Sequence, residues 1–218
     1  NTRKKLKKNS IIQLPWQEVV TKFSALEIIS QDEIESIHHA SLDILESVGM
    51  KVLHQDAREI FKNAGLDVNE SSKMVYFDKD LVLSTISLPP KEFTLHARNP
   101  ERNLKVGGNH IIFSAVGGPA YCSDLDKGRR RGSFEDLRNY MKIIQSLNII
   151  HQEGGMSFET IELPPETRYL DLYLAQFQLL DKNCQSYPLG AERTRDCIDM
   201  HCIALECSRE ELADSPSV

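Results

Sequence analysis

The sequence lacks the features that identify several large classes of protein. No stretch of its 218 residues approaches the run of about 20 apolar residues that a membrane-spanning helix needs. The glycine motifs of nucleotide-binding loops, G-x-G-x-x-G and G-x-x-x-x-G-K-[ST], are both absent. The net charge of −6 also differs from the basic surface that a nucleic-acid-binding protein normally carries. We therefore expect neither a membrane nor a nucleic acid as a partner.

The cysteines form no disulfide or metal-binding pattern. There are 5 of them, an odd number, no apolar signal segment follows the basic run 3–8, and C-x-x-C is absent. We therefore expect reduced thiols and a cytoplasmic protein. Cys197, Cys202 and Cys207 are evenly spaced along the chain. Five residues turn an α-helix by about 140°, which spreads the three sulfurs around it. We predict buried helix thiols there and no bound metal.

Before residue 107 the pattern predicts a small α+β region without an evident chemical group. Residues 30–49 have Ser30 and Glu33 in capping-box spacing, apolar residues at helical intervals, and Gly49 as a stop. The following elements are a short strand at 51–53, a helix at 55–64, a strand pair within 67–77, a short helix capped by Asp78, and strands at 91–97 and 103–106.

From residue 107 a repeating pattern begins. Apolar runs start near residues 110, 149 and 184, and each leads through glycine into a segment with helical spacing. Their separation of roughly 35 to 40 residues suits consecutive βα units on a parallel sheet. The runs end at Gly117–Gly118, at Gly154–Gly155 and at Gly190. Sheets of this kind bind ligands at that edge.

Several separated segments also resemble one protein family. They are HASLDILESVGMKVLH, FTLHARNPERNLKVGG, FSAVGGPAYCSDLDKGRRRGSFEDLRNY and PPETRYLDLYLAQFQLLDK followed by GAERTRDCIDM. In this order they resemble the N-terminal half of the trimethylamine methyltransferase family. The resemblance implies transfer of a methyl group from trimethylamine or a betaine-like quaternary amine to the cobalt of a corrinoid. The implied partners are a corrinoid protein, which carries the cobalamin, and a small methylated amine.

The resemblance implies a (β/α)₈ barrel preceded by an α+β extension. We therefore expect an α/β fold in three regions. Residues 1–29 form a basic, partly disordered segment, residues 30–106 the α+β region, and residues 107–218 the first three βα units of a TIM-type barrel that is incomplete. Family members specific for trimethylamine carry a pyrrolysine in the later barrel half, so we expect the catalytic residues beyond Val218. An open sheet exposes apolar surface, so we also expect association, for example into a homo-oligomer.

The candidate substrate-binding residues lie at or just beyond the predicted strand ends. Aromatic faces stabilise a quaternary ammonium by about 0.5 to 2 kcal/mol per contact, and Phe113, Tyr121 and Tyr187 would provide them. Glu153 would balance the positive charge, and Gln152 would hydrogen-bond a substrate carboxylate or a corrinoid amide. The alternative is a core role for each aromatic residue and a charged loop position for Glu153.

The glycine pairs are the candidate corrinoid-binding residues. Without bulky side chains, Gly117, Gly118, Gly154 and Gly155 would let a broad, flat macrocycle approach the main chain. The alternative is a set of turn glycines with no ligand. The basic residues 129–131 would either dock an acidic corrinoid protein or form a solvated hairpin tip.

Two other functions stay open from the sequence. The first is an inactive or non-catalytic module that binds a quaternary amine or a corrinoid without turnover. The second is a metal-dependent hydrolase, because His110, His151 and Glu153 fall on or near adjacent predicted strands. Barrel hydrolases usually hold their metal with closer motifs such as H-x-H, which the sequence lacks.

Overall fold

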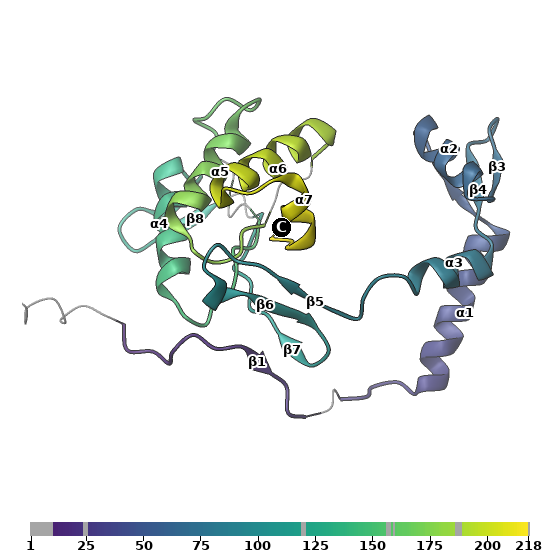
Figure 1. Cartoon of the computed structure of the whole chain (residues 1–218), viewed down its shortest axis with the longest axis horizontal. Coiled ribbons are helices and arrows are strands. Elements are labelled where there is room, and N and C mark those ends of the chain that lie inside the picture. Colours follow the sequence, from purple (N-terminus) through teal and green to yellow (C-terminus); the bar gives the residue numbers. More distant parts are fainter. Residues whose placement is uncertain are drawn as a thin grey trace, which may run out of the picture. The chain divides into compact units, whose positions relative to one another are not determined.

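The computed structural model describes residues 11–23, 26–118, 121–155, 158, 160–185 and 189–217. The chain divides into two compact units, which are visible in Figure 1. The smaller unit is Phe23–Lys91, and the larger unit combines Asn1–Lys22 with Glu92–Val218. Within the described residues, no helix has both the length and the apolar character that crossing a membrane requires.

The smaller unit packs helices against a small antiparallel sheet. Helix α1 (Gln31–Ser47) begins at a capping box, in which Ser30 Oγ accepts a hydrogen bond from the main-chain N–H of Glu33. The sheet has the strand order β2 (Met50–Lys51), β4 (Met74–Tyr76), β3 (Asp67–Asn69). Helices α2 (Gln55–Asn63) and α3 (Lys79–Ile86) flank the β3–β4 hairpin in sequence. These elements confirm the helices and the hairpin that the sequence predicts in this region.

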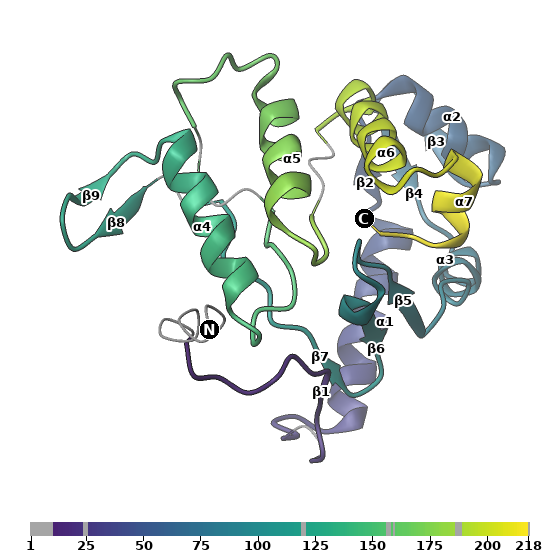
Figure 2. The same cartoon turned by 60° about the vertical axis from the view of Figure 1, so that its left-hand side comes forward.

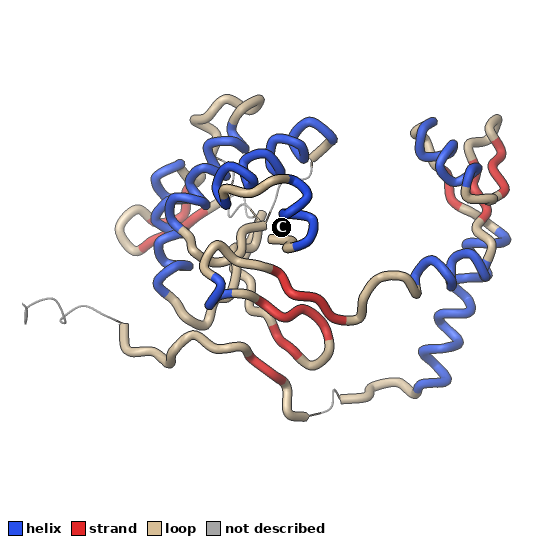
Figure 3. The backbone as a smooth tube through the Cα atoms, in the orientation of Figure 1, coloured by secondary structure: helices blue, strands red, loops and turns tan. Residues whose placement is uncertain are grey.

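Among its described residues, the larger unit has three separate antiparallel strand pairs; strands are red in Figure 3. Strand β1 (Val19–Val20) pairs with β7 (His110–Ile111), β5 (Glu92–Leu95) with β6 (Leu104–Gly107), and β8 (Cys122–Asp124) with β9 (Gly128–Arg130). A short 3₁₀ helix, η1 (Pro100–Arg102), lies between β5 and β6. The β8–β9 hairpin is the charged hairpin that the sequence predicts.

The N-terminal segment of the larger unit was not predicted to have structure beyond its basic character. Residues 11–22 belong to this unit, and within them β1 pairs with β7. The Gln13 side chain donates to the carbonyl of Ser146 and accepts from the main-chain N–H of Asn148. The predicted segment, basic and partly disordered, is residues 1–29, of which residues 1–10, 24 and 25 lie outside the described residues.

The helices of the larger unit are α4 (Phe134–Ser146), α5 (Arg168–Leu179), α6 (Ala191–Leu205) and α7 (Arg209–Asp214). Helix α5 packs between α4 and α6, as Figure 2 shows. Apolar side chains of α4 and α5 form the core together with residues of the adjoining loops; its buried members are Leu137, Met141, Ile144, Phe158, Leu172, Ala175, Leu180 and Cys184.

Three extended segments of the larger unit pair in parallel with one another. Ser114 pairs with Gln152, and Gln152 pairs with Asn183, both in parallel orientation. The main-chain N–H of His151 donates to Phe113 O at 2.8 Å, and that of Glu153 donates to Asn183 O at 3.2 Å. We call residues 113–115, 151–153 and 183–185 the first, second and third parallel segments. Helices α4, α5 and α6 follow them in order.

This arrangement confirms a mixed α/β fold and leaves the barrel as a prediction. The described residues form several small sheets and no closed barrel. The predicted strand from residue 110 is also divided, since His110–Ile111 pairs antiparallel with β1 and only the residues after it join the parallel segments. Near the C-terminus, helix α7 follows α6 and was not predicted from the sequence.

Candidate functional site

The candidate site is the edge formed by the carboxyl ends of the three parallel segments, because the predicted residues cluster there. Gly117 and Gly154 meet at this edge, main chain against main chain. A Cβ atom at Gly117 would collide with the carbonyl oxygens of Gly154 and Gly155, and one at Gly154 would collide with the carbonyl of Ala115. Neighbouring segments therefore approach so closely that only glycine fits at both positions.

The second glycine of each pair has a conformational role. Gly118 and Gly155 have φ angles of 81° and 74°, in the left-handed region that favours glycine. A Cβ at Gly155 would press on the Gln185 side chain, whereas one at Gly118 would have no described atom within 4 Å. Packing and turn geometry thus account for the glycine pairs, and their contact with a corrinoid stays a prediction.

Gln152 faces away from the helices that cover the sheet. Residues paired across parallel segments point to the same face, so Gln152 shares its face with Ser114. The Gln152 Nε2 group donates to Ser114 Oγ at 2.5 Å. Ser114 is exposed and Gln152 is half-buried. We call the surface that carries these two side chains the open face; it is the accessible polar surface next to the glycine edge.

Glu153 points to the opposite face and is completely buried there. Its Oε2 accepts a hydrogen bond from the Gly155 N–H at 2.8 Å and another from Gln176 Nε2, on helix α5, at 3.0 Å. Burial raises the pKa of Glu153 to about 7, although the main-chain N–H groups of Gly155 and Gln185 oppose the shift. The carboxyl group therefore ties the second glycine pair to helix α5.

The polar cluster around Glu153 has more acceptors than donors. Both Glu153 Oε1 and Gln176 Oε1 are buried, and neither has a hydrogen-bond partner among the described residues. Such a pair is satisfied when the carboxyl group is protonated or when a donor enters from outside. Burial raises the pKa of Glu153, and a protonated carboxyl group would in turn provide the donor that one of the two unpaired acceptors lacks.

His151 is a structural residue in this arrangement. It is buried, its Nδ1 accepts from the Phe113 N–H at 3.0 Å, and its Nε2 lies 3.2 Å from Gln17 O. These partners fit the neutral ring with the proton on Nε2, and burial lowers the pKa of His151. The rings of Trp16 and Phe113 pack on it at centroid distances of 5.7 and 5.8 Å.

The hydrolase alternative finds no support in this geometry. Both ring nitrogens of His151 have main-chain partners, and His110 faces Gly107 O and Glu18. The described residues contain no group of His, Cys, Asp or Glu side chains that would hold a metal ion.

The predicted aromatic residues do not gather around one point. The Phe113 ring packs on His151, on the face opposite Gln152. The Tyr121 ring has the Arg129 guanidinium above it, 4.3 Å from the centroid, so a cation of the chain itself already occupies that face. Tyr187 lies outside the described residues.

The basic hairpin offers less free charge than its sequence indicates. The Arg130 guanidinium pairs with Asp124 at 2.7 Å and also with Asp136, which belongs to the capping box of α4. Because Arg130 is ion-paired and Arg129 stacks on Tyr121, a docking role for the hairpin would depend chiefly on Arg131.

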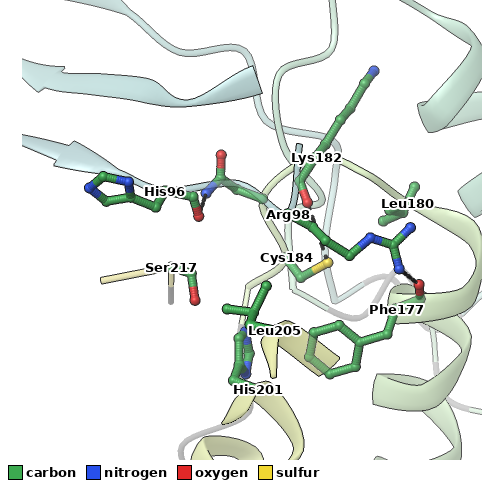
Figure 4. Close-up of a pocket in the computed structure, with 10 residues that line it drawn as sticks. His96, Arg98, Phe177, Leu180, Lys182, Cys184, His201, Leu205 and Ser217 are labelled. Carbon is green, nitrogen blue, oxygen red and sulfur yellow. Dashed lines mark hydrogen bonds between the residues drawn. The ribbon is translucent and has the colours of Figure 1, made fainter. Parts of the chain in front are cut away.

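A small cavity lies beside the third parallel segment (Figure 4). Its volume of about 10 Å³ holds about one water molecule, which is too little for a methylated amine. Burial raises the pKa of Cys184, in its wall, to about 12, and His201 hydrogen-bonds to Cys197 O at 3.0 Å. The cavity therefore belongs to the packing of the third segment against α5 and α6.

Sequence reasoning missed two residues that support the site. Gln176 is buried on α5, and nothing in the helical pattern distinguishes it from an ordinary surface glutamine. Lys182 is buried at the start of the third segment, where its ammonium group donates to the carbonyls of Ile144, Leu147 and Ile150 at 2.6 to 2.7 Å. An oppositely charged neighbour, Asp181, and the preceding helix end were the only sequence signals for that position.

Comparison with known proteins yields matches over most of the chain. The family model described as trimethylamine methyltransferase matches residues 1–218. A glycine betaine methyltransferase of Desulfitobacterium hafniense (strain Y51) is 32% identical over 176 residues, which cover 81% of this chain and 36% of that protein. The trimethylamine methyltransferase MttB of Desulfitobacterium hafniense (strain DSM 10664 / DCB-2) is 29% identical over 120 residues, 55% of this chain and 24% of that protein. The chain thus spans about a third or less of these relatives.

Proposed function

Because the chain belongs to the trimethylamine methyltransferase family, we propose that the protein carrying it moves a methyl group from a methylated amine to the cobalt of a corrinoid. The amine is trimethylamine or a betaine-like quaternary amine, and the corrinoid is held by a partner protein. The observation that carries the proposal is the family match over residues 1–218. Trimethylamine and glycine betaine, which the names of two relatives contain, are the first substrates to test.

The chemistry requires little from the chain beyond binding and alignment. A quaternary ammonium has no lone pair to protonate, so an acid does not activate its C–N bond. A reduced corrinoid cobalt would supply the nucleophile for the methyl carbon, and the C–N electron pair would stay with the departing amine. Trimethylamine, which has a lone pair, would also have to take up a proton so that dimethylamine leaves as a neutral molecule. The protein has to hold the cation in line with the attacking atom and exclude water.

Gln152 and Ser114 on the open face are the described residues best placed to contact the substrate. One N–H of Gln152 donates to Ser114 Oγ, and the described residues provide no partner for the other N–H. That group would donate to the carboxylate of a betaine, whereas trimethylamine has no carboxylate to accept it. Gln152 would then contribute to the choice between these two amines.

Glu153 would act as a positioning residue. Through Oε2 it fixes the Gly155 N–H and therefore the turn that follows Gln152. When ionised, its carboxylate also adds negative charge near the edge where a cation would bind. The aromatic contribution stays a prediction apart from this arrangement, because the Phe113 ring packs on His151 and the Tyr121 ring on Arg129.

The glycine edge fits the approach of a flat macrocycle only in part. Main chain fills the space beside Gly117 and Gly154, so these two residues serve the packing of the segments. Gly118 is next to open space among the described residues, and Gly155 shapes the adjoining turn. We therefore propose Gly118 and Gly155 as the positions of closest corrinoid approach.

The test is methyl transfer by the complete protein that carries this sequence. The protein is mixed with reduced cobalamin and either trimethylamine or glycine betaine, and formation of methylcobalamin is followed by its absorption spectrum. We expect transfer from at least one amine. Failure with both amines and with other betaines, by a folded protein that binds them in calorimetry, would support the alternative of a binding module without turnover.

Substitution of Gln152 tests whether the open face contacts the substrate. Gln152→Ala is expected to raise KM for glycine betaine about tenfold, the equivalent of one lost hydrogen bond to a charged group. Gln178→Ala, on the exposed side of α5, serves as the control. An unchanged KM for the Gln152 variant would exclude its contact with the substrate.

A further inference from the structure

The end of helix α6 places two cysteines at positions that meet in space. Glu206 adopts the left-handed conformation, with φ 54° and ψ 42°. The Cys207 N–H donates to Cys202 O at 3.0 Å, and the Glu206 N–H reaches Ile203 O at 3.4 Å. This pair of hydrogen bonds around a left-handed residue is the Schellman motif.

The motif defines which side chains touch. It places the residue after the left-handed position, here Cys207, beside the residue whose carbonyl accepts its N–H, here Cys202. The two thiols interact, and this contact is one of the causes that raise the pKa of Cys207, after burial. The sequence spacing predicted sulfurs spread around the helix, but the chain leaves the helix at Glu206, so the prediction is wrong for this pair.

The thiol pair is also accessible. Both cysteines are partly exposed. Cys207 lines an open cavity of about 450 Å³ between the α6–α7 turn and the segment around His96. A small oxidant in solution therefore reaches Cys207 directly. Figure 2 shows how α6 leads through this turn into α7.

We propose that Cys202 and Cys207 form a redox-sensitive pair that closes to an intramolecular disulfide at the C-terminus of α6. With hydrogen peroxide as the oxidant, the Cys207 thiolate attacks one peroxide oxygen and becomes a sulfenic acid, and hydroxide leaves. The Cys202 thiol then attacks the Cys207 sulfur, the S–S bond forms and water leaves. The two thiols give up two electrons, and the peroxide is reduced to two molecules of water.

The other cysteines lack this combination of contact and access. Cys197 and Cys184 are buried, and burial raises the pKa of the Cys184 thiol to about 12. Cys122 is partly exposed, but burial and the nearby Asp136 raise its pKa. It packs against the apolar core that contains Cys184, whose thiol is buried. Oxidation of the folded chain is therefore expected to concentrate on Cys202 and Cys207.

The test uses the full chain in its folded, reduced form. After limited exposure to hydrogen peroxide, remaining thiols are blocked with N-ethylmaleimide, and the protein is digested without reductant. Cleavage after Arg195, Glu206 and Arg209 gives the fragments 196–206 and 207–209. A Cys202–Cys207 disulfide keeps these fragments linked, and fragmentation in the mass spectrometer identifies which sulfur of the longer fragment carries the bond.

Linked fragments through Cys202 are expected, and Cys202→Ser should abolish them. Cys197→Ala, which alters the other cysteine of the same fragment, should leave them unchanged. We expect the disulfide to exceed sulfinic acid at Cys207 about tenfold, since contact with a second thiol traps the sulfenic acid as it forms. The rate of disulfide formation is set by the first oxidation of Cys207. The rate should also rise with pH above neutral, because the raised pKa keeps Cys207 protonated at neutral pH. A bond through Cys197, or sulfinic acid at Cys207 with no linked fragments, would overturn the proposal.

Discussion

Single residues at the parallel segments show how burial decides a role that the sequence leaves open. Glu153 was expected either to face a cationic substrate or to lie on a charged loop. It is instead buried beneath the glycine edge and tied to Gly155 and Gln176. Nothing in the sequence around Glu153 reveals this, because the direction of its side chain depends on the pairing of the second segment with the first and third. The candidate position was predictable, whereas its environment was not.

Glu153 makes the stability of the protein depend on pH. Its pKa is raised from 4.5 to about 7, so the folded state binds more protons than the unfolded state between these values. Its contribution therefore favours folding at low pH and is lost as the pH rises to about 7. We expect Glu153→Gln to stabilise the protein at pH 8 by up to about 3 kcal/mol relative to the parent, and by much less at pH 5. Urea unfolding at both pH values measures this.

The control for this experiment is Glu166→Gln, which changes an exposed carboxylate in the loop before α5. It should move the unfolding free energy by less than about 0.5 kcal/mol at either pH. Equal effects of the Glu153 substitution at pH 5 and pH 8 would contradict the assigned titration.

Lys182 gives a second prediction for a single side chain. Its ammonium group satisfies the carbonyls of Ile144, Leu147 and Ile150 at the C-terminal end of α4, where positive charge is also favoured by the helix dipole. Burial, with the Arg102 charge, lowers its pKa to about 8, so it stays mostly charged at neutral pH.

Lys182→Met should lower the unfolding free energy by about 2 to 4 kcal/mol, because buried carbonyls lose their donor. Lys142→Met, on the exposed side of α4, should change it by less than about 0.5 kcal/mol. Thermal unfolding of the two variants is monitored by circular dichroism. Similar melting temperatures for the Lys182 and Lys142 variants would show that water replaces the ammonium group.

Among the secondary-structure elements, capping signals were the most informative part of the sequence. The helices at Ser30 and Asp78 begin where their side-chain caps predict, and α4 begins at a capping box of the same kind at Ser133. Helix α7 was missed, although Ser208 and Glu211 form a capping box that the same rule would have found. Strand β1 could not be found this way, since two valines give no alternation and its partner β7 lies far away in sequence.

The cap at Ser133 is also a test of how much a local interaction stabilises its element. Its Oγ accepts from the Asp136 N–H at 3.1 Å, and Asp136 in turn accepts from the Ser133 main chain. Ser133→Ala should therefore cost about 1 kcal/mol of unfolding free energy. Ser146→Ala, at the other end of α4, is the matched control and should cost less than half as much. Urea denaturation measures the unfolding free energy of both variants. Equal losses of unfolding free energy would mean that the cap makes no net contribution.

For the whole molecule, the sequence predicts the order of elements better than their assembly. Its repeated apolar runs and glycines indicate βα units, and the structure places three segments in parallel with a helix after each. The pairing is nevertheless limited to isolated bridges, and the described residues close no barrel. The spacing of apolar residues in the sequence indicates which face of an element is apolar. It does not report how long neighbouring segments stay paired, which depends on side chains distant in sequence.

The division into two units leads to a prediction about the molecule as a whole. Each unit has its own buried apolar residues, with Val75 at the centre of the smaller sheet and Leu137 in the core of the larger unit, both fully buried. Val75→Ala should lower stability by about 1 to 3 kcal/mol. Because each core supports its own unit, hydrogen exchange should accelerate in α1, β3 and β4, and it should remain unchanged in α4 and α5. Leu137→Ala should produce the reverse pattern. Mass spectrometry of the exchanged peptides measures the exchange rate of each element in both variants. Faster exchange throughout the chain in either variant would mean that the two cores unfold as one cooperative structure.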